Sequence, residues 1–406
     1  MYTHKRHSDI HMSDIKKRSK DLFEVYEKLT DTDEDFGQAG PADLATAKSL
    51  EASYAASQWR LMWRKFVCNK VAIVGGIIVL LYYLSALFAG FLAPYTLSTR
   101  FGRYIYMPPQ RVHFFNDGKF QPFVYSVTLT IDENLRKFYE PDLTKKMPIR
   151  FFGRGEPYKL FGLIETDMHL FQAPGGIISL LGTDRQGRDM LSRVLYGSQI
   201  SLSIGLVGVL LSLFFGTVLG DVSGYYGGWV DDFIQRLIEL VRSFPAIPLW
   251  MALTAAVPPH WPPLWTYFTI TLILSLVTWT WLARQLRGKV VALRNEDFIL
   301  AAKLAGASDT RIIFKHIIPA TLGHIIVVAT LAMPAMILAE AALSFLGLGL
   351  RPPITSWGVL LKEVQNIQSI ALYPWVFTPA AAIVIVIIAF SFLGDGLRDA
   401  ADPYTV

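Results

Sequence analysis

Charged residues are scarce in this chain of 406 residues, and they are unevenly distributed. Asp, Glu, Lys and Arg together make up 17% of the sequence, whereas about 25% is usual for a soluble protein. The first 70 residues are highly charged, while long stretches after Ala72 contain almost no charge. This pattern favours several membrane spans over one large soluble core.

Several signatures of chemistry are also missing. The single cysteine, Cys68, excludes an intrachain disulfide and a cysteine-based zinc cluster. Neither Gly-Lys pair, at residues 118–119 and 288–289, is followed by Ser or Thr, so the chain lacks a phosphate-binding loop. Any ATP hydrolysis would therefore have to come from another polypeptide. Because no His-Glu-x-x-His set or catalytic constellation is present, we expect no metal, no cofactor and no enzyme activity in this chain.

Six apolar runs have the length, or nearly the length, of a membrane-spanning helix, which requires about 20 residues. They cover residues 71–93, 200–219, 244–257, 265–282, 325–346 and 375–393. The third run is the weakest, because it contains Pro245 and Pro248, and prolines in a span need neighbouring helices to satisfy the freed carbonyls. The first run starts too late to be a secretory signal peptide, so we expect a cytoplasmic N-terminus.

The distribution of basic residues predicts the orientation. The segment between the fourth and fifth runs is rich in them, whereas the short loop at residues 258–264 has none. The positive-inside rule therefore places this segment and both termini in the cytoplasm, and residues 94–199 outside. Nucleic-acid binding is a poor alternative explanation for the net charge of +5, because no basic stripe is interleaved with exposed aromatics. The basic residues of the segment are Arg284, Arg287, Lys289, Arg294, Lys303, Arg311 and Lys315.

Composition divides the chain into five expected regions. In the N-terminal tail, residues 13–29 have a helical pattern, which is either part of a solvated, partly disordered segment or a docking helix. Trp59 and Trp63 lie among basic residues and predict an interfacial helix. Alternation over residues 123–131 predicts strands. The regions are a cytoplasmic tail (1–56), an interfacial helix with the first span (57–93), an extracytoplasmic insert (94–199), a core of spans two to six (200–393) and a cytoplasmic C-terminus (394–406).

The most informative segment is the cytoplasmic loop at residues 284–320. Residues 298–305 contain strong helix formers, Gly306 permits a left-handed turn, and Ser308 can cap a second helix. Pro319 is predicted to break that second helix before the fifth span. Two short helices exposed between spans are poorly explained by packing in lipid and suit docking into a groove on a partner.

This segment resembles the EAA loop of ABC importer permeases. Ala301, Ala302, Gly306 and Pro319 match the motif, with the expected spacing from glycine to proline. Leu300 stands where the general motif has Glu, and His316 where it usually has Ile, departures that resemble the dipeptide, oligopeptide and nickel permease branch. The resemblance implies a coupling helix that contacts an ATPase subunit, with site residues Ala301, Ala302, Gly306, Ser308, Asp309 and Pro319.

Further segments resemble the same branch. The chain departs from it at Ser198-Gln199, where Ala-Arg is usual, and in the length of its outer region. The resemblance runs from about residue 59 to the end, and it implies an all-α polytopic membrane protein with six transmembrane helices and the type I permease fold of ABC importers. The similar segments are residues 181–193 (the GTDxxGRDxLSR signature), 224–231 (the next cytoplasmic loop), 339–358 (the end of the fifth span) and 394–403 (the C-terminus).

Two sets of ionisable residues outside the loop each allow two interpretations. Glu340 lies deep in the fifth run, where an ionisable residue is a candidate for the gate or substrate path. The alternative for Glu340 is a structural hydrogen bond to a neighbouring helix. Asp184, Arg185, Arg188 and Asp189 form a tight cluster before the second run, which is either a contact for an extracytoplasmic binding protein or a salt-bridged turn.

The resemblance also implies a function, that of a permease subunit of an ATP-driven importer in a prokaryotic inner membrane. The implied partners are a second homologous permease, two ATP-binding cassette subunits that bind ATP and Mg²⁺, an extracytoplasmic solute-binding protein and the lipid bilayer. Peptides are the first expected cargo, with nickel and oligosaccharides as alternatives. The rival hypothesis is an ion-coupled secondary transporter acting alone, which needs ionisable residues or broken helices near the midplane, and Glu340 is its main support.

Overall fold

The computed structural model describes residues 58–116, 118–131, 137–365 and 371–401. The chain divides into two compact units, residues 1–61 and 62–406, and almost all described residues belong to the second. The helix expected at residues 13–29 lies outside the described residues. A helix is present over the predicted interfacial segment, as α3 (Gln58–Cys68).

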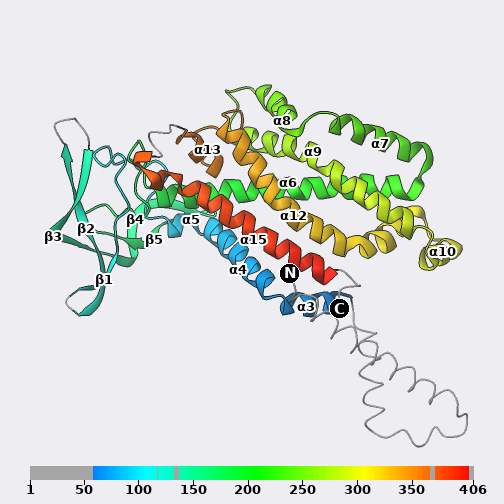
Figure 1. The fold of residues 1–406 in the computed structure, drawn as a ribbon, viewed down its shortest axis with the longest axis horizontal. Coiled ribbons are helices and arrows are strands. Elements are labelled where there is room, and N and C mark those ends of the chain that lie inside the picture. Colours follow the sequence, from blue (N-terminus) through cyan, green and yellow to red (C-terminus); the bar gives the residue numbers. More distant parts are fainter. Residues whose placement is uncertain (1–57, 117, 132–136, 366–370, 402–406) are drawn as a thin grey trace, which may run out of the picture. The chain divides into compact units, whose positions relative to one another are not determined.

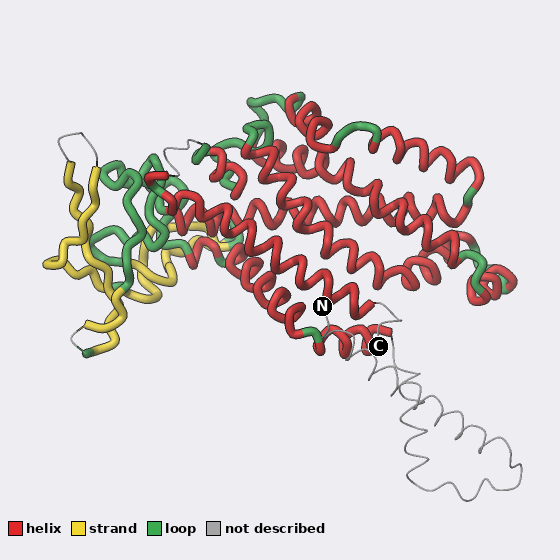
Figure 2. Tube along the Cα trace, in the orientation of Figure 1, coloured by secondary structure: helices red, strands yellow, loops and turns green. Residues whose placement is uncertain are grey.

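Five helical stretches in the described residues are long and apolar enough to cross a membrane. Each overlaps a run that the sequence predicts as a span, and the stretches run side by side (Figure 2). They are α4 (Lys70–Leu87), α6 (Met190–Tyr226), α9 (Pro263–Leu293), the stretch Asp309–Phe345 that includes α11 (Asp309–Ile312) and α12 (Ile318–Phe345), and the stretch Pro374–Ala401 that includes α15 (Thr378–Ala401).

The third predicted run forms part of a bent helix pair and not a straight span of its own. Helices α7 (Gly228–Arg242) and α8 (Ala246–Ala255) are bent by 82° relative to each other. α8 alone has 10 residues, about 15 Å of helix, which is too short to cross a bilayer. The break lies at Pro245, because proline cannot continue the preceding helix. The described residues therefore contain five candidate spans, or six if the bent pair is one span.

Helix α6 packs against α4, α9 and α12, and α15 covers α4 and α12 (Figure 1). Glycines allow these helices to approach closely, as is usual where helices pack in membranes. A Cβ atom on Gly220 of α6 would lie 2.6 Å from the carbonyl oxygen of Ala283 in α9. A Cβ atom on Gly75 of α4 would likewise lie 2.6 Å from the carbonyl oxygen of Ala389 in α15. Gly75 of α4 therefore faces the bundle.

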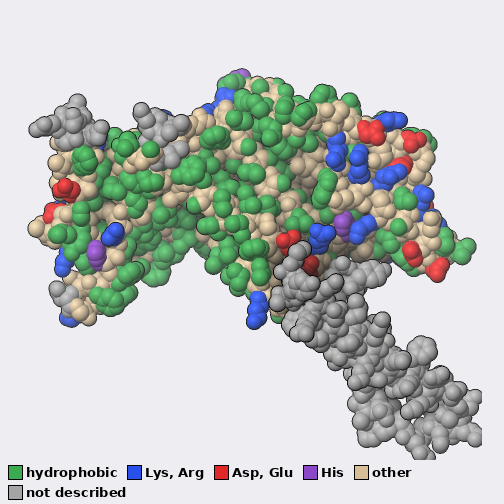
Figure 3. All heavy atoms as spheres, in the orientation of Figure 1, with side chains coloured by type: hydrophobic (Ala, Val, Ile, Leu, Met, Phe, Trp, Pro, Cys, Tyr) green, Lys and Arg blue, Asp and Glu red, His purple; other side chains and the backbone are tan. Residues whose placement is uncertain are grey.

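The surface of this helical bundle is largely apolar over its middle, and charged side chains gather at the end that carries α7 and α10 (Asp297–Leu304) (Figure 3). Exposed apolar side chains include Leu80 of α4, Phe214 of α6 and Leu276 of α9. An apolar surface of this extent is unfavourable in water and suits contact with hydrocarbon. The structure is therefore that of a helical, polytopic membrane protein.

Between α4 and α6 the chain forms two small antiparallel sheets, so the insert is a β region on an otherwise helical protein (Figure 2). The strand predicted at residues 123–131 is confirmed as part of β2. Val124, Met147 and Ile178 are buried in a core that the insert forms for itself. One sheet contains β1 (His113–Asn116), β2 (Lys119–Ile131) and β3 (Lys137–Pro148), and the other is a hairpin of β4 (Arg150–Leu160) and β5 (Ile164–Gln172).

The helices that flank the insert differ in length from the predicted spans. α4 ends at Leu87 and is followed by the short α5 (Ala89–Leu92), both within the first predicted run. α6 begins at Met190 and not at residue 200. The earlier start follows from a cap, because the Asp189 carboxylate accepts a hydrogen bond from the Ser192 backbone N–H at 2.7 Å.

Candidate functional site

The loop that resembles a coupling helix is an elbow of two helices, α10 and α11, joined at Gly306. Gly306 has a φ of +78°, a conformation that glycine adopts without a Cβ penalty. Its N–H donates to the carbonyl of Lys303 at 2.9 Å, and the N–H of Ala307 donates to the carbonyl of Ala302 at 3.0 Å. These two bonds are the usual way in which a glycine ends a helix. The predicted turn at Gly306 is therefore confirmed.

The second arm of the elbow starts as the sequence predicts. Ser308 caps α11, and its hydroxyl accepts a hydrogen bond from the Arg311 N–H at 3.4 Å. Asp309, the first residue of α11, accepts a hydrogen bond from the Tyr225 hydroxyl of α6 at 2.7 Å. This contact fixes the elbow to a membrane-spanning helix.

The inner face of the elbow is anchored by packing. Ile299 of α10 and Ile312 of α11 have no exposed surface, and they pack with Tyr225 of α6 and Val290 of α9. The ammonium group of Lys303 lies 5.0 Å from the centre of the Tyr225 ring, a geometry typical of a cation–π contact. Tyr225 therefore contacts both arms of the elbow, a role that no local sequence pattern reveals.

The outer face of the elbow exposes large apolar side chains. Leu304 is 90% exposed and Phe298 is 44% exposed. Leu300, which replaces the Glu of the general motif, is 44% exposed. Of the two motif alanines, Ala301 is exposed and Ala302 is half-buried. A short, rigid helix with exposed apolar residues is suited to a hydrophobic groove on another protein.

The prediction for Pro319 is wrong, because the helix does not break there. α11 continues through a π-helical turn (Ile313–Ile317) into α12, which runs to Phe345 with Pro319 in its first turn. In an α-helix, a proline ring clashes with the carbonyl four residues earlier. The wider π turn, in which the N–H of Ile318 bonds to the carbonyl of Ile313, avoids that regular geometry just before the proline.

Glu340 lies in α12 with no exposed surface, surrounded by serines from three segments. The hydroxyls of Ser344 and Ser356 donate to one carboxylate oxygen at 2.8 and 2.7 Å, and Ser201 of α6 donates to the other at 3.1 Å. Ser356 also caps α13 (Trp357–Lys362). These hydrogen bonds agree with the structural interpretation of Glu340, in which its carboxylate joins neighbouring helices. A role for Glu340 in the gate or substrate path stays a prediction.

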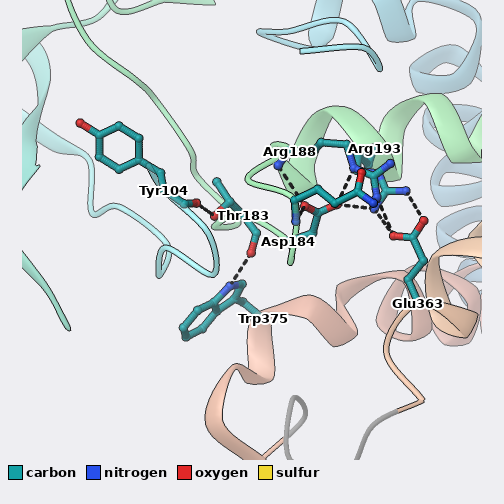
Figure 4. A network of polar contacts seen from close by, with 8 residues as sticks. Tyr104, Thr183, Asp184, Arg188, Arg193, Glu363 and Trp375 are labelled. Carbon is teal, nitrogen blue, oxygen red and sulfur yellow. Dashed lines mark hydrogen bonds and ion pairs between the residues drawn. The ribbon is translucent and has the colours of Figure 1, made fainter. Parts of the chain in front are cut away.

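Two of the four residues in the predicted cluster before α6, Asp184 and Arg188, belong to an internal ion-pair network (Figure 4). The Asp184 carboxylate pairs with Arg188 at 2.7 Å and with Arg193 at 2.6 Å. Both arginines also pair with Glu363, each at 2.7 Å. Desolvation raises the pKa of Glu363, but the hydrogen bonds and positive charges of the two arginines outweigh it and lower that pKa below its usual value.

The other two members of the cluster have different surroundings. Asp189 is buried and accepts hydrogen bonds from Ser179 and Ser192, both at 2.7 Å. Burial raises its pKa, although these hydrogen bonds oppose the shift. Arg185 is exposed. Of the four predicted residues, Arg185 is therefore the one whose side chain is directed to the surface and open to a contact with another protein.

Residues 208–405 match the family described as the binding-protein-dependent transport system inner membrane component. Residues 57–109 match the N-terminal TM domain of oligopeptide transport permease C. The elbow, Glu340 and Glu363 all lie inside the first match.

Three curated relatives are similar to this chain. A dipeptide transport system permease protein from Alkalihalophilus pseudofirmus is 42% identical over 55% of this chain and 71% of its own length. An oligopeptide transport system permease protein from Bacillus subtilis is 30% identical over 90% of this chain and 94% of its own length. A glutathione transport system permease protein from Pectobacterium atrosepticum is 30% identical over 89% of this chain and 96% of its own length. Because such identity extends along nearly the whole chain, this protein belongs to the binding-protein-dependent transport system inner membrane component family, as a permease subunit of the dipeptide and oligopeptide ABC importer type.

Proposed function

We propose that this chain forms one half of the translocation path of an ATP-driven peptide importer, with a second, homologous permease subunit as the other half. Two ATP-binding cassette subunits bind ATP and Mg²⁺, and an external solute-binding protein delivers the cargo. The proposed architecture is the type I permease fold with six spans, the bent pair of α7 and α8 counting as one. The elbow and both termini lie in the cytoplasm, and the β region lies outside.

The observation that carries this proposal is the elbow. It is rigid on its inner face, where Ile299 and Ile312 are fully buried, and apolar on its outer face, where Leu304 is 90% exposed. Three large apolar side chains, Phe298, Leu300 and Leu304, are exposed on one helix of eight residues, and such a surface is suited to a groove on another protein. The proposed groove belongs to an ATP-binding cassette subunit.

The elbow also provides a route for coupling. Asp309 bonds to Tyr225 in α6, and α11 continues without a break through the π turn into α12. A displacement of the elbow is therefore transmitted to two membrane-spanning helices. Coupling free energy is reciprocal, so closure of the nucleotide sites biases the path, and the state of the path biases nucleotide binding.

Peptides are the proposed cargo. Relatives along the whole length of the chain are named as oligopeptide and glutathione permeases, and both cargoes contain peptide bonds. A ligand screen on the associated solute-binding protein tests this point. Selective binding of nickel or of an oligosaccharide, with no peptide binding, contradicts it.

The proposed role of the elbow is tested with Leu304→Asp in the co-expressed transporter. We expect loss of the ATPase subunits on purification and loss of ATP-driven uptake in proteoliposomes, because a charge is placed in an apolar contact. The matched control is Leu143→Asp in β3, which is 67% exposed and is expected to retain the ATPase subunits. Normal ATPase retention and uptake by Leu304→Asp would contradict the proposal.

The rival function, an ion-coupled carrier that acts alone, is tested by reconstitution of the purified chain. The proposal expects no peptide uptake into vesicles under any ion gradient without the ATPase subunits. Gradient-driven uptake by the chain alone would establish the rival. The burial of Glu340 among three serines favours the proposal, because a coupling carboxylate needs access to the ion.

A further inference from the structure

An apolar groove of about 800 Å³ lies where the β4–β5 hairpin returns to the first membrane-spanning helix. One side is formed by α4 and α5, with Leu81, Leu84 and Phe91, and the other by the hairpin, with Leu160, Ile164 and Met168. We propose that this groove binds the acyl chain of a membrane phospholipid and that the hairpin tip is inserted into the bilayer surface. This assignment requires only that α4 spans the membrane.

The hairpin is amphipathic, and its register creates the apolar face. Leu160 pairs with Ile164 and Tyr158 with Thr166, and these residues line the groove. Between them, Lys159 pairs with Glu165 on the opposite face, where their charged groups lie 3.5 Å apart. Since successive side chains of a strand point to opposite faces, one face of the hairpin is apolar and the other is charged.

The tip of the hairpin, residues 161–163, carries large apolar side chains that its turn geometry does not call for. Phe161 and Gly162 both have positive φ, +54° and +71°, where Asn or Gly is the usual choice. Phe161 instead brings its ring to 5.6 Å from that of Phe88, at the end of α4. Leu163, the next residue but one, is 86% exposed. A two-stranded hairpin with such a tip is poorly suited to water.

The depth of the groove follows from α4. The helix has 18 residues, about 27 Å at the usual rise, which is close to the thickness of the hydrocarbon core. Leu81 lies six residues before Leu87, the end of the helix, and therefore about 9 Å inside it. The groove beside Leu81 and Leu84 is thus at the level of acyl chains.

The chemistry of the groove favours a lipid chain over a polar ligand. The Ser85 hydroxyl donates to the carbonyl of Tyr82, and the Tyr158 hydroxyl donates to the carbonyl of Met168, each at 2.8 Å. The Thr166 oxygen accepts a hydrogen bond from the Met168 N–H at 3.3 Å. Since these polar groups bond within the protein, the groove offers mainly shape and apolar contact.

The shape of the groove also disfavours a helix of another subunit as its occupant. Helices that pack in membranes use small residues at their contact. In α4, Gly75 is turned toward α15, against the carbonyl oxygen of Ala389. On the groove side, the bulky Leu81, Leu84 and Phe88 surround the small Ser85, and a flexible acyl chain adapts to this uneven surface better than a rigid helix.

The hairpin can enter the bilayer surface without leaving its turn amides unpaired. The N–H of Gly162 donates to the carbonyl of Lys159 at 3.3 Å, and the N–H of Leu163 donates to that of Leu160 at 3.1 Å. Unpaired backbone groups are costly in hydrocarbon, so the tip alone is inserted. The rest of the hairpin is fixed to the chain after α5, because His169 bonds to the carbonyl of Ala93 at 2.6 Å and Gln172 to that of Pro94 at 2.6 Å.

The position of the tip is tested in the assembled transporter in phospholipid vesicles. A nitroxide is attached at Leu163→Cys in a Cys68→Ser background, and its collisions with oxygen and with a water-soluble nickel chelate are measured. We expect high oxygen and low nickel accessibility. The matched control is Glu165→Cys, on the charged face, for which we expect the reverse. Equal nickel accessibility at the two positions, or shielding of the Leu163 label from both reagents, would overturn the proposal.

The occupant of the groove is tested separately with phospholipids that contain a photoactivatable group in the acyl chain. We expect adducts on residues 158–168 of the wild-type transporter and their loss in Met168→Asp, which places a charge in the groove. Phospholipid with the group on its headgroup is expected to label the charged face near Lys159 instead. Cross-linking of residues 158–168 to another subunit, with no lipid adduct, would overturn the assignment.

Discussion

In the elbow, apolar side chains are exposed and a few internal contacts hold the backbone, whereas around Glu340 polar side chains are buried and bonded to one another. Leu304 is 90% exposed, and Glu340 has no exposed surface. A folded protein normally does the reverse with both residue types. The exposed apolar side chains of the elbow are available to another protein, whereas the buried carboxylate of Glu340 already has three donors within this chain.

The surroundings of Glu340 resemble a second buried polar site, in which charged side chains are also paired with one another. This site is the network of Asp184, Arg188, Arg193 and Glu363. It joins the start of α6 to the residue after α13, and the Arg193 side chain is only 4% exposed. Such buried ion pairs are costly to break, because the remaining charge is left without a partner. Removal of one member of the network is therefore expected to destabilise the protein more than a change at any single residue of the elbow.

The largest expected effect is that of Arg193→Ala. It leaves two largely buried carboxylates, Asp184 and Glu363, with Arg188 as their shared ion-pair partner. Because one negative charge is then uncompensated, we expect a loss of about 3–5 kcal/mol in the free energy of unfolding. Thermal unfolding of the purified protein in detergent measures it. Arg185→Ala, the exposed neighbour, serves as the control and is expected to change stability by less than about 0.5 kcal/mol. Equal melting temperatures for the two variants would contradict the network.

The next effect is that of Glu340→Ala, which removes the acceptor of three serine hydroxyls. We expect a loss of about 2–3 kcal/mol, because buried groups without a hydrogen-bond partner are destabilising. Glu340→Gln retains one acceptor oxygen and is expected to lose less. If the alanine variant were fully stable but altered the concentration dependence of uptake, Glu340 would instead be a residue of the path.

A smaller effect is expected for Gly306→Ala, which affects the backbone of the elbow alone. A Cβ at this position meets no atom within 4 Å, so the cost of about 1 kcal/mol arises from the positive φ. Gly288→Ala in α9 is the matched control, because its Cβ is equally unobstructed and alanine is favoured in a helix by about 0.5–1 kcal/mol. Opposite signs in the two melting temperatures are expected, and the same sign would refute the assigned turn.

The last expected effect is the pH dependence of the ion pairs that Glu363 makes. The pKa of Glu363 is below its usual 4.5 in the folded protein, so its ion pairs stabilise the fold above that value. This contribution is lost as the pH falls through the lower folded-state pKa. Glu363→Gln is expected to be less stable than the wild type near neutral pH and to converge with it in acid. A constant difference between the two across this range would contradict the assignment.

The sequence predictions are correct where a feature depends on residues close together in the chain. The end of α10 and the cap of α11 depend on hydrogen bonds between residues at most five positions apart, and the sequence predicts both. The strand at residues 123–131 was also predicted from local alternation. Pro319 was predicted wrongly, because its effect depends on whether the preceding turn is α or π, and no residue type specifies that choice.

The sequence by itself determined which segments are apolar enough to enter a membrane and where the elbow turns, because hydropathy and helix termination are properties of neighbouring residues. Only the tertiary structure decided which ionisable residues are satisfied internally. Arg193 meets Glu363 from 170 positions away and Ser201 meets Glu340 from 139. It also decided that the β4–β5 hairpin packs against α5, next to the end of α4. Partners so distant along the chain are brought together by the packing of whole helices, which no short sequence pattern records.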